Sequence, residues 1–240
     1  MTTTTERLQE STDQDMMEFP ISPRLIGGRW IALAAFVFVA AWLLGLTIGF
    51  TTNSPAPSDS AQTIGTYFTQ HRQLAILQAY LLDGVAGAAL VVFGASLWTA
   101  LGRAERTPGA LPAIMFGASV AAGAVSLLQG LFTQVLADHV AQMGDAGAIR
   151  TLYDLNTEGD TYKLLALGVF LGAAALIILR SRVLPRWIGW VAAVLGPLLA
   201  VAGWNFILYP SVQYLAYAVL LILLLVWVAA VGVVGLRRAA

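Results

Sequence analysis

Several polar side chains with the capacity for chemistry occur inside long apolar stretches of this sequence. Asp83 interrupts the apolar stretch 74–101, and Gln129 interrupts the stretch 111–136. An aspartate at the centre of a membrane-spanning helix costs about 2.5–3.5 kcal/mol on insertion scales, so such a residue needs a partner or a functional role. If both stretches are antiparallel helices that rise about 1.5 Å per residue, the two side chains lie at nearly the same depth. We therefore expect them to face a common site.

Other polar residues fall in the same halves of the apolar stretches. Helical spacing puts Tyr80 on one face with Asp83, and Thr133 on one face with Gln129. The opposite halves carry few polar side chains, which indicates a pocket that is closed on one side. The residues that we expect to line this pocket are Asp83, Gln129, Tyr80, Gln78, Thr133, Asn205 and Tyr209. Two alternatives stay open for the aspartate, namely a protonated or hydrogen-bonded link between helices and a role in proton coupling.

The two histidines suggest a second kind of site. His71 and His139 lie at neighbouring ends of the stretches 74–101 and 111–136, and Asp138 and Asp160 lie on the same side. Imidazole and carboxylate groups are ligands for zinc or manganese, and three such ligands with a water molecule would make a hydrolytic centre. No HExxH motif is present, so a solvated acidic rim is the default interpretation. We expect no other cofactor.

The segment 154–159 begins like a calcium-binding loop, with oxygen ligands at alternate positions and glycine sixth. The twelfth position is Leu165, where such a loop needs a glutamate. We therefore expect Gly159 to be a turn residue and Asp160 to lie in the first turn of the next membrane span, where the helix dipole favours an acid. The cations that we expect to pair with nearby acids or lipid phosphates are Arg72, Arg150 and Lys163.

The composition indicates what kind of structure must position these residues. The chain has 240 residues, of which 58% are hydrophobic and 11% charged, whereas a soluble domain carries roughly 25% charged residues. This composition predicts a membrane protein that has the lipid bilayer as its partner. The net charge of zero excludes binding to a nucleic-acid backbone, and the absence of cysteine excludes disulfides and thiolate nucleophiles. No P-loop or dinucleotide-binding glycine motif occurs, so the sequence favours a non-enzymatic protein.

Each of six apolar stretches is long enough to cross a bilayer as a helix. The predicted fold class is therefore all-α, a polytopic transmembrane helical bundle of six spans. The spans are expected at Trp30–Phe50, Leu74–Leu101, Leu111–Leu136, Tyr162–Leu179, Trp187–Tyr209 and Val212–Leu236. They form a domain at 30–236 with external loops at about 51–73 and 137–161, preceded by a polar tail at 1–29 and followed by a basic end at 237–240.

The orientation follows from the distribution of Lys and Arg. Ten of the thirteen lie in the tail, in the connections after the second and fourth spans, and at the end of the chain, and three lie on the other side. Short loops rich in these residues stay in the cytoplasm. We therefore expect a multi-pass protein of the plasma or inner membrane with both termini cytoplasmic. The tail has no cationic leader or cleavage site, so the first span is expected to be a retained helix.

The external loops are expected to contain short surface helices. Ile64, Tyr67 and Phe68 recur at helical spacing in the first loop. The same spacing occurs in the second loop, at Ile149, Leu152 and Tyr153. Both segments are typical of helices that lie along a membrane surface.

Three short motifs carry a resemblance to a known family. They are YFTQHR at 67–72, LYDL at 152–155 and SRVLPRWIGW at 181–190. Together they resemble an actinobacterial and wider bacterial family of six-span membrane proteins that is classed only as a domain of unknown function, over roughly residues 29–236. The resemblance implies a bacterial inner-membrane protein and supplies no catalytic residues.

The leading functional hypothesis is a membrane protein that binds, senses or transports a small molecule, lipid or ion in an outward-facing pocket around Asp83 and Gln129. Binding or sensing is favoured over transport because the apolar halves offer no inward path. One alternative is a membrane-embedded metal-dependent hydrolase that uses His71 and His139. Another is a structural or regulatory protein whose partner docks on residues 1–23. The sequence predicts no oligomeric state.

Overall fold

The fold is built only from helices and turns within the residues that the structure describes. A computed structural model describes residues 27–102, 109–208 and 210–239, with side chains except at 204–217 and 239. No strand occurs in these ranges. The expected all-α fold class is therefore confirmed.

Six helical segments in these ranges are long and apolar enough to cross a membrane, as the sequence predicts. The first is α2 (Gly28–Thr52), which is followed by the short helix α3 (Ala61–Gln70). The second consists of α4 (Arg72–Ala79), the π-helix η2 (Tyr80–Val85) and α5 (Ala86–Gly102). The third consists of α6 (Ala110–Val135), the π-helix η3 (Leu136–Val140) and α7 (Ala141–Met143). The last three are α8 (Ala146–Ser181), α9 (Arg186–Leu208) and α10 (Pro210–Ala239).

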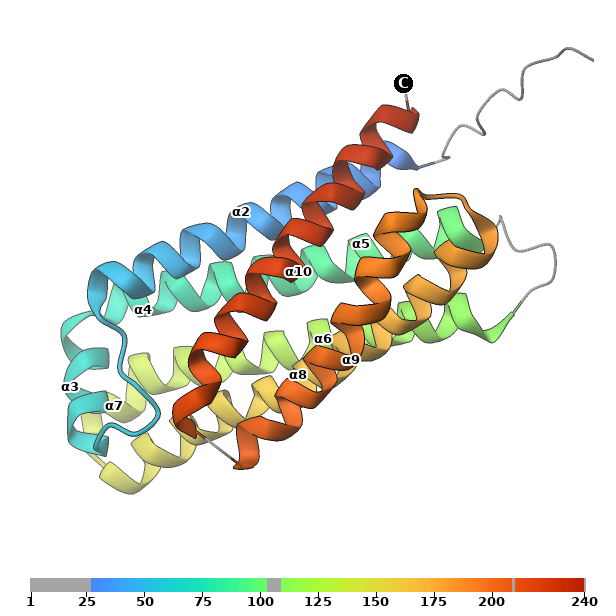
Figure 1. Cartoon of the computed structure of the whole chain (residues 1–240). Helices are drawn as coiled ribbons and strands as arrows, with labels where there is room; N and C mark the ends of the chain where they lie inside the picture. Colours follow the sequence, from blue (N-terminus) through green and yellow to red (C-terminus); the bar gives the residue numbers. More distant parts are fainter. Residues whose placement is uncertain (1–26, 103–108, 209, 240) are drawn as a thin grey trace, which may run out of the picture.

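The spans form a closed ring of neighbours. Along the chain each span contacts the next, and α10 returns to contact α2. Figure 1 shows α3 and α7 at one end of the bundle, which we call the α3 end. The start of α2 and the end of α10 lie together at the opposite end. If both termini are cytoplasmic, as the sequence predicts, the α3 end is external.

Large apolar side chains cover the outside of the bundle. Leu44, Val194 and Ile222 are 57%, 61% and 57% exposed, and they come from three different spans. A soluble monomer rarely exposes apolar surface on this scale, because burying it away from water is favourable. Lipid is the environment that these faces fit, so the protein is a multi-pass membrane protein.

Three aromatic side chains fill the centre of the bundle. Phe93, Phe170 and Trp227 are at most 1% exposed and come from α5, α8 and α10. Their ring centroids are 6.2–6.3 Å apart in all three pairs, and the indole of Trp227 donates a 3.0 Å hydrogen bond to the carbonyl of Ile188. This aromatic cluster packs α5, α8 and α10 together between the α3 end and the opposite end.

The connection before the second span forms a helix where the sequence predicts one. The side chain of Ser60 caps α3 by accepting a 3.1 Å hydrogen bond from the amide of Thr63. Ile64, Tyr67 and Phe68 are buried against the rest of the α3 end. The expected helix is therefore confirmed, whereas its apolar face packs against the protein and not along a membrane surface.

The connection before the fourth span differs from the sequence-based expectation. The segment with Ile149 is not a separate surface helix but the beginning of α8, which runs without a break for 36 residues. The turn expected at Gly159 is wrong, and so is the place of Asp160 in a first helical turn. The helix is capped earlier, by Asp145, whose carboxylate accepts hydrogen bonds from the amides of Gly147 and Ala148.

Gly159 has a packing role instead of a turn role. A Cβ atom at this position would lie 3.0–3.1 Å from the side chain of Gln129 on α6. Because glycine lacks that atom, α8 can pass close to the glutamine. The close approach of these two helices positions the site described next.

Candidate functional site

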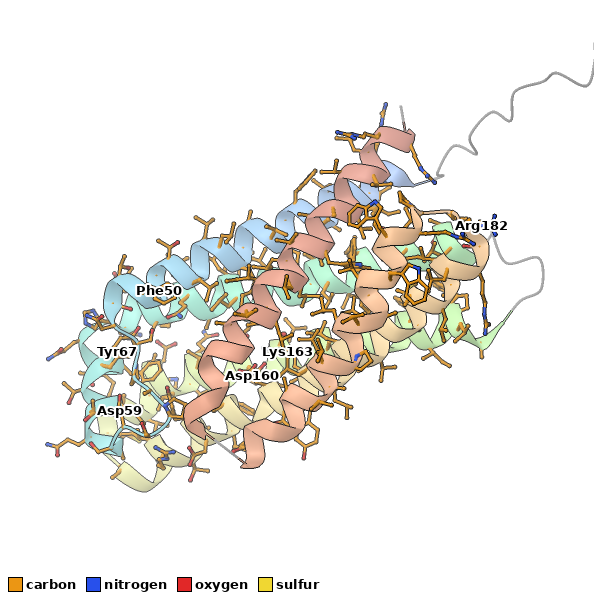
Figure 2. The ribbon with its side chains drawn as sticks, viewed as in Figure 1. Phe50, Asp59, Tyr67, Asp160, Lys163 and Arg182 are labelled. Atoms are coloured by element: carbon orange, nitrogen blue, oxygen red, sulfur yellow. The ribbon has the colours of Figure 1, made fainter. Side chains whose placement is uncertain are left out.

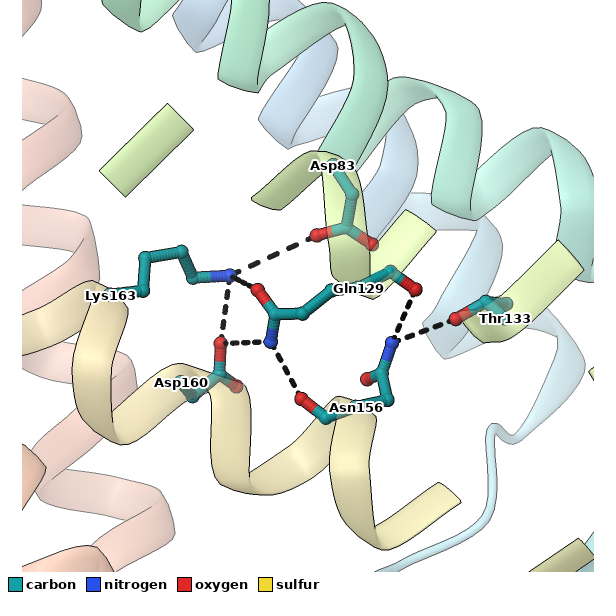
Figure 3. Close-up of polar contacts among 6 residues, drawn as sticks. All are labelled: Asp83, Gln129, Thr133, Asn156, Asp160 and Lys163. Atoms are coloured by element: carbon teal, nitrogen blue, oxygen red, sulfur yellow. Dashed lines mark hydrogen bonds and ion pairs between the residues drawn. The ribbon is translucent and has the colours of Figure 1, made fainter. Parts of the chain in front are cut away.

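One face of α8 carries three polar residues that point into the bundle. Asn156, Asp160 and Lys163 stand at positions i, i+4 and i+7, which share a helix face. Figure 3 shows that these side chains face Gln129 and Thr133 of α6 and Asp83 of η2. The site is therefore built from α8, α6 and the second span.

The ammonium group of Lys163 is at the centre of a group of six polar residues, which we call the lysine cluster. Its members are Asp83, Gln129, Thr133, Asn156, Asp160 and Lys163. Lys163 Nζ lies 2.7 Å from Asp160 Oδ1, donates a 2.7 Å hydrogen bond to Gln129 Oε1 and lies 3.8 Å from Asp83 Oδ1. The lysine residue is only 7% exposed. Its three N–H groups thus face oxygen atoms from three different helical segments.

Two amide side chains join α6 to α8 beside the lysine. Gln129 Nε2 donates hydrogen bonds to the carbonyl of Asn156 at 2.7 Å and to Asp160 Oδ1 at 3.0 Å. In return, Asn156 Nδ2 donates to the carbonyl of Gln129 and to Thr133 Oγ1, both at 2.8 Å. Both amide groups use all their N–H donors, so this part of the cluster is fully engaged in holding the helices together.

The cluster holds one cation and two carboxylates. Asp160 contacts both Lys163 and Gln129 at hydrogen-bond distance. Asp83 is 3.8 Å from the lysine, which is beyond hydrogen-bond distance, and it makes no hydrogen bond to the other residues drawn in Figure 3. With all three groups ionised, the excess negative charge therefore belongs to Asp83.

A π-helical turn presents Asp83. The aspartate lies inside η2, and π-helical turns of this kind are frequent at functional sites. Such a turn holds more residues than an α-helical turn, so residues three positions apart are separated by a wider angle. The shared face expected for Tyr80 and Asp83 is therefore lost. Tyr80 is 64% exposed and borders an outer groove between α4 and α6 instead.

Asp83 borders a cavity of about 160 Å³ at the α3 end. Four other polar residues line the same cavity, and they are Ser54, Gln78, Thr133 and Asn156. Three of the seven residues expected to line a pocket, Gln78, Asp83 and Thr133, are therefore brought together. Gln129 is 3% exposed and is not among the residues that line the cavity. Asn205 and Tyr209 fall outside the described side chains.

An aromatic wall completes the cavity. It consists of Tyr67, Phe68 and Tyr153, whose neighbouring ring centroids are 5.2 and 6.4 Å apart. The Tyr67 hydroxyl lies 2.8 Å from Thr52 Oγ1 and 3.1 Å from Ser54 Oγ. The Tyr153 hydroxyl donates a 2.5 Å hydrogen bond to the carbonyl of Pro55. Both tyrosine hydroxyls thus hold the segment 52–55, and both residues also line the cavity.

A cation ties the connection between α2 and α3 to α8. Arg150 donates a 3.0 Å hydrogen bond to the carbonyl of Asp59 and forms a 2.7 Å ion pair with Asp154. Arg72 forms a 2.7 Å ion pair with Asp138. The expectation that Arg72, Arg150 and Lys163 pair with nearby acids is confirmed.

The residues considered for a metal site are not gathered into one cluster. The ring of His71 packs against Tyr67, with centroids 5.2 Å apart, and His139 is exposed. Asp138 pairs with Arg72, and Asp160 belongs to the lysine cluster. Within the residues described, no three histidine, aspartate or glutamate side chains come together as metal ligands.

Sequence reasoning missed Lys163, Asp160 and Asn156 as members of the pocket cluster. Because a turn was expected at Gly159, these residues were divided between a loop and the edge of a span. The available signal was the i, i+4, i+7 spacing, which becomes apparent once α8 is continuous from Ala146. Figure 2 shows Lys163 and Asp160 among the helices, with Tyr67 toward the α3 end and Arg182 at the opposite end.

Comparison with known proteins identifies a family but no characterised relative. The family model described as Domain of unknown function (DUF4386) matches residues 31–235, which cover nearly the whole bundle and all of the lysine cluster. No curated protein and no solved structure matches the chain. The match agrees with the family classification that the sequence motifs imply.

Proposed function

The chain belongs to the DUF4386 family, and we propose that it is a binding or sensing protein that holds a small ligand in the cavity beside Asp83. The observation that carries this proposal is a carboxylate that borders a cavity among helices of a membrane protein without a hydrogen bond from the other residues of the lysine cluster. An aspartate side chain that is only 15% exposed is costly among membrane-spanning helices unless partners satisfy it, and Lys163 pairs with it only at 3.8 Å. A ligand in the cavity would supply that partner.

The residues of the cluster differ in how far they link helices, and this difference supports a binding role over a purely structural one. Gln129 and Asn156 have their amide donors engaged between α6 and α8, which is what a link between helices requires. Asp83 adds no hydrogen bond to that link. Its position at the cavity is therefore better explained by a ligand than by helix packing.

The size of the cavity limits the ligand. A cavity of about 150 Å³ holds a molecule the size of benzene, and the cavity here is about 160 Å³. The ligand should therefore have about six non-hydrogen atoms. A whole lipid is too large for this space.

The interior of the bundle favours binding over transport. Phe170 follows Lys163 by seven residues along α8, which places the aromatic cluster about 10 Å deeper at about 1.5 Å per residue. Phe93, Phe170 and Trp227 are buried against one another at that depth. These described side chains lie between the cavity and the opposite end of the bundle, so we expect a polar ligand to enter and leave at the α3 end.

The absence of cysteine makes the proposal directly testable. Thr133→Cys would place a single thiol at the cavity, Thr66→Cys one on the exposed face of α3, and Ala174→Cys one in the closed core. We expect methyl methanethiosulfonate, a small neutral reagent, to modify Thr133→Cys at a rate between those of the other two variants. A rate no higher than that of Ala174→Cys would contradict the proposal.

The same variants test the side on which the cavity opens. The distribution of arginine predicts that the α3 end is external. We therefore expect a membrane-impermeant maleimide to label Thr66→Cys in intact cells. Labelling only after the membrane is opened would show that the cavity faces the cytoplasm.

A further inference from the structure

We propose that the ligand of this cavity is a small organic ammonium ion. The inference rests on the proposed function and goes beyond it by naming the ligand class. It follows from three properties of the lining residues, namely their charge, their aromatic rings and the kind of hydrogen-bonding atoms that remain unused.

The net charge of the cluster favours a cationic ligand. Lys163 contributes one positive charge, and Asp83 and Asp160 contribute two negative charges. Since Asp160 is the closer partner of the lysine, a monovalent cation beside Asp83 would balance the remaining charge. An anionic ligand would add a second uncompensated charge in a site of low dielectric, which is strongly unfavourable.

The aromatic wall favours an organic cation as the ligand. Tyr67, Phe68 and Tyr153 line the same cavity as Asp83. Aromatic faces attract ammonium groups through the ring quadrupole, and clusters of such rings bind quaternary ammonium ligands. The hydroxyls of both tyrosines are engaged with the segment 52–55, so what these residues offer to the ligand is ring surface.

Two residues that line the cavity have hydrogen-bond acceptors that are not engaged. Both N–H groups of Asn156 are donated to α6, so this residue has its side-chain carbonyl oxygen left. Asp83 offers carboxylate oxygens. An ammonium ion that carries N–H groups would supply the donors that these acceptors lack, and a methylated one would satisfy the charge and the rings.

The first test measures charge selectivity at the cavity. Thr133→Cys and Thr66→Cys are treated with trimethylammonium-ethyl and sulfonato-ethyl methanethiosulfonate, and the cationic-to-anionic rate ratio is taken for each. We expect the ratio at Thr133→Cys to exceed that at Thr66→Cys by about tenfold, which corresponds to about 1.4 kcal/mol. Asp83→Asn should remove this excess. Glu158→Gln, which neutralises an exposed carboxylate on α8, should leave it unchanged.

The second test measures reversible binding with tetramethylammonium as the probe. We expect tetramethylammonium chloride to slow the modification of Thr133→Cys by methyl methanethiosulfonate, whereas an equal concentration of sodium chloride does not. Asp83→Asn should abolish this protection, and Glu158→Gln should retain it. Ala75→Cys, which lines the cavity from α4, gives the same measurement without disturbing the bond from Asn156 to Thr133.

The outcomes separate the two proposals. The ammonium inference would be overturned if the neutral reagent modified Thr133→Cys and Ala75→Cys but the site showed no cation selectivity and no protection by tetramethylammonium. Such a result would still leave an open cavity. Equal protection by sodium and tetramethylammonium would overturn the ammonium inference in favour of an inorganic cation. No modification of either variant by the neutral reagent would instead overturn the proposed function.

Discussion

Replacement of Lys163 by methionine is the sharpest test of the cluster. Lys163→Met keeps an unbranched side chain of similar length and removes the ammonium group. The change removes contacts with Asp160 at 2.7 Å, Gln129 at 2.7 Å and Asp83 at 3.8 Å. It leaves two carboxylates in the interior with no cation between them.

The distances set the size of the expected effect. At an effective dielectric constant of about 20, Coulomb's law gives about 6 kcal/mol at 2.7 Å and about 4 kcal/mol at 3.8 Å before the cost of desolvation is subtracted. Removing one partner of a buried ion pair costs about 3–5 kcal/mol in measured cases. We expect Lys163→Met to lower the free energy of unfolding by about this amount.

The assay is reversible unfolding in mixed detergent micelles, followed by tryptophan fluorescence. Asp83→Asn should restore more stability to Lys163→Met than Asp160→Asn does, because Asp160 still accepts a hydrogen bond from Gln129 after the lysine is lost. Glu158→Gln serves as the control and should change stability by less than about 0.5 kcal/mol. A loss below about 1 kcal/mol for Lys163→Met would refute the assignment of Lys163 as the centre of the cluster.

Three further predictions concern packing and access. Gly168→Ala should destabilise the protein by about 1–3 kcal/mol in the same micelle assay, because the added Cβ would lie 2.7 Å from a backbone carbonyl of α9. Gly172→Ala is the control and should not destabilise the protein, because the space around Gly172 is open. Tyr153→Phe removes a hydrogen bond to the segment 52–55 and should speed the modification of Thr133→Cys several-fold; an unchanged rate would contradict a covering role for that segment. Tyr80→Phe should leave tetramethylammonium protection unchanged, since this side chain lies outside the cavity; lost protection would contradict that placement.

The spans and the central pair of polar residues could be predicted from the sequence because both depend on local pattern. A run of apolar residues must form a helix in lipid, whatever its neighbours are. The shared depth of Asp83 and Gln129 follows from the helix rise alone. In the structure, both side chains accordingly contact the same ammonium group, that of Lys163.

The details that the sequence did not predict depend on contacts between helices. Gly159 was expected to form a turn, whereas its function is to let α8 approach Gln129. The π-helical turn at η2 likewise has no local signal, and it moves Tyr80 away from Asp83. In both cases the local preference is weak, and packing against a neighbouring helix decides the outcome.

The composition of the cluster argues that it is more than a link between helices. Buried ion pairs are often no more stabilising than apolar side chains of the same shape, and amide pairs such as Gln129 and Asn156 already join α6 to α8. Lys163 and Asp160 alone would complete that link with no net charge. Asp83 adds a second carboxylate that lies 3.8 Å from the lysine and borders a cavity. Under the proposed function, a cation in the cavity would account for this extra charge, and the buried aromatic cluster between the cavity and the opposite end would favour binding at the α3 end over transport through the bundle.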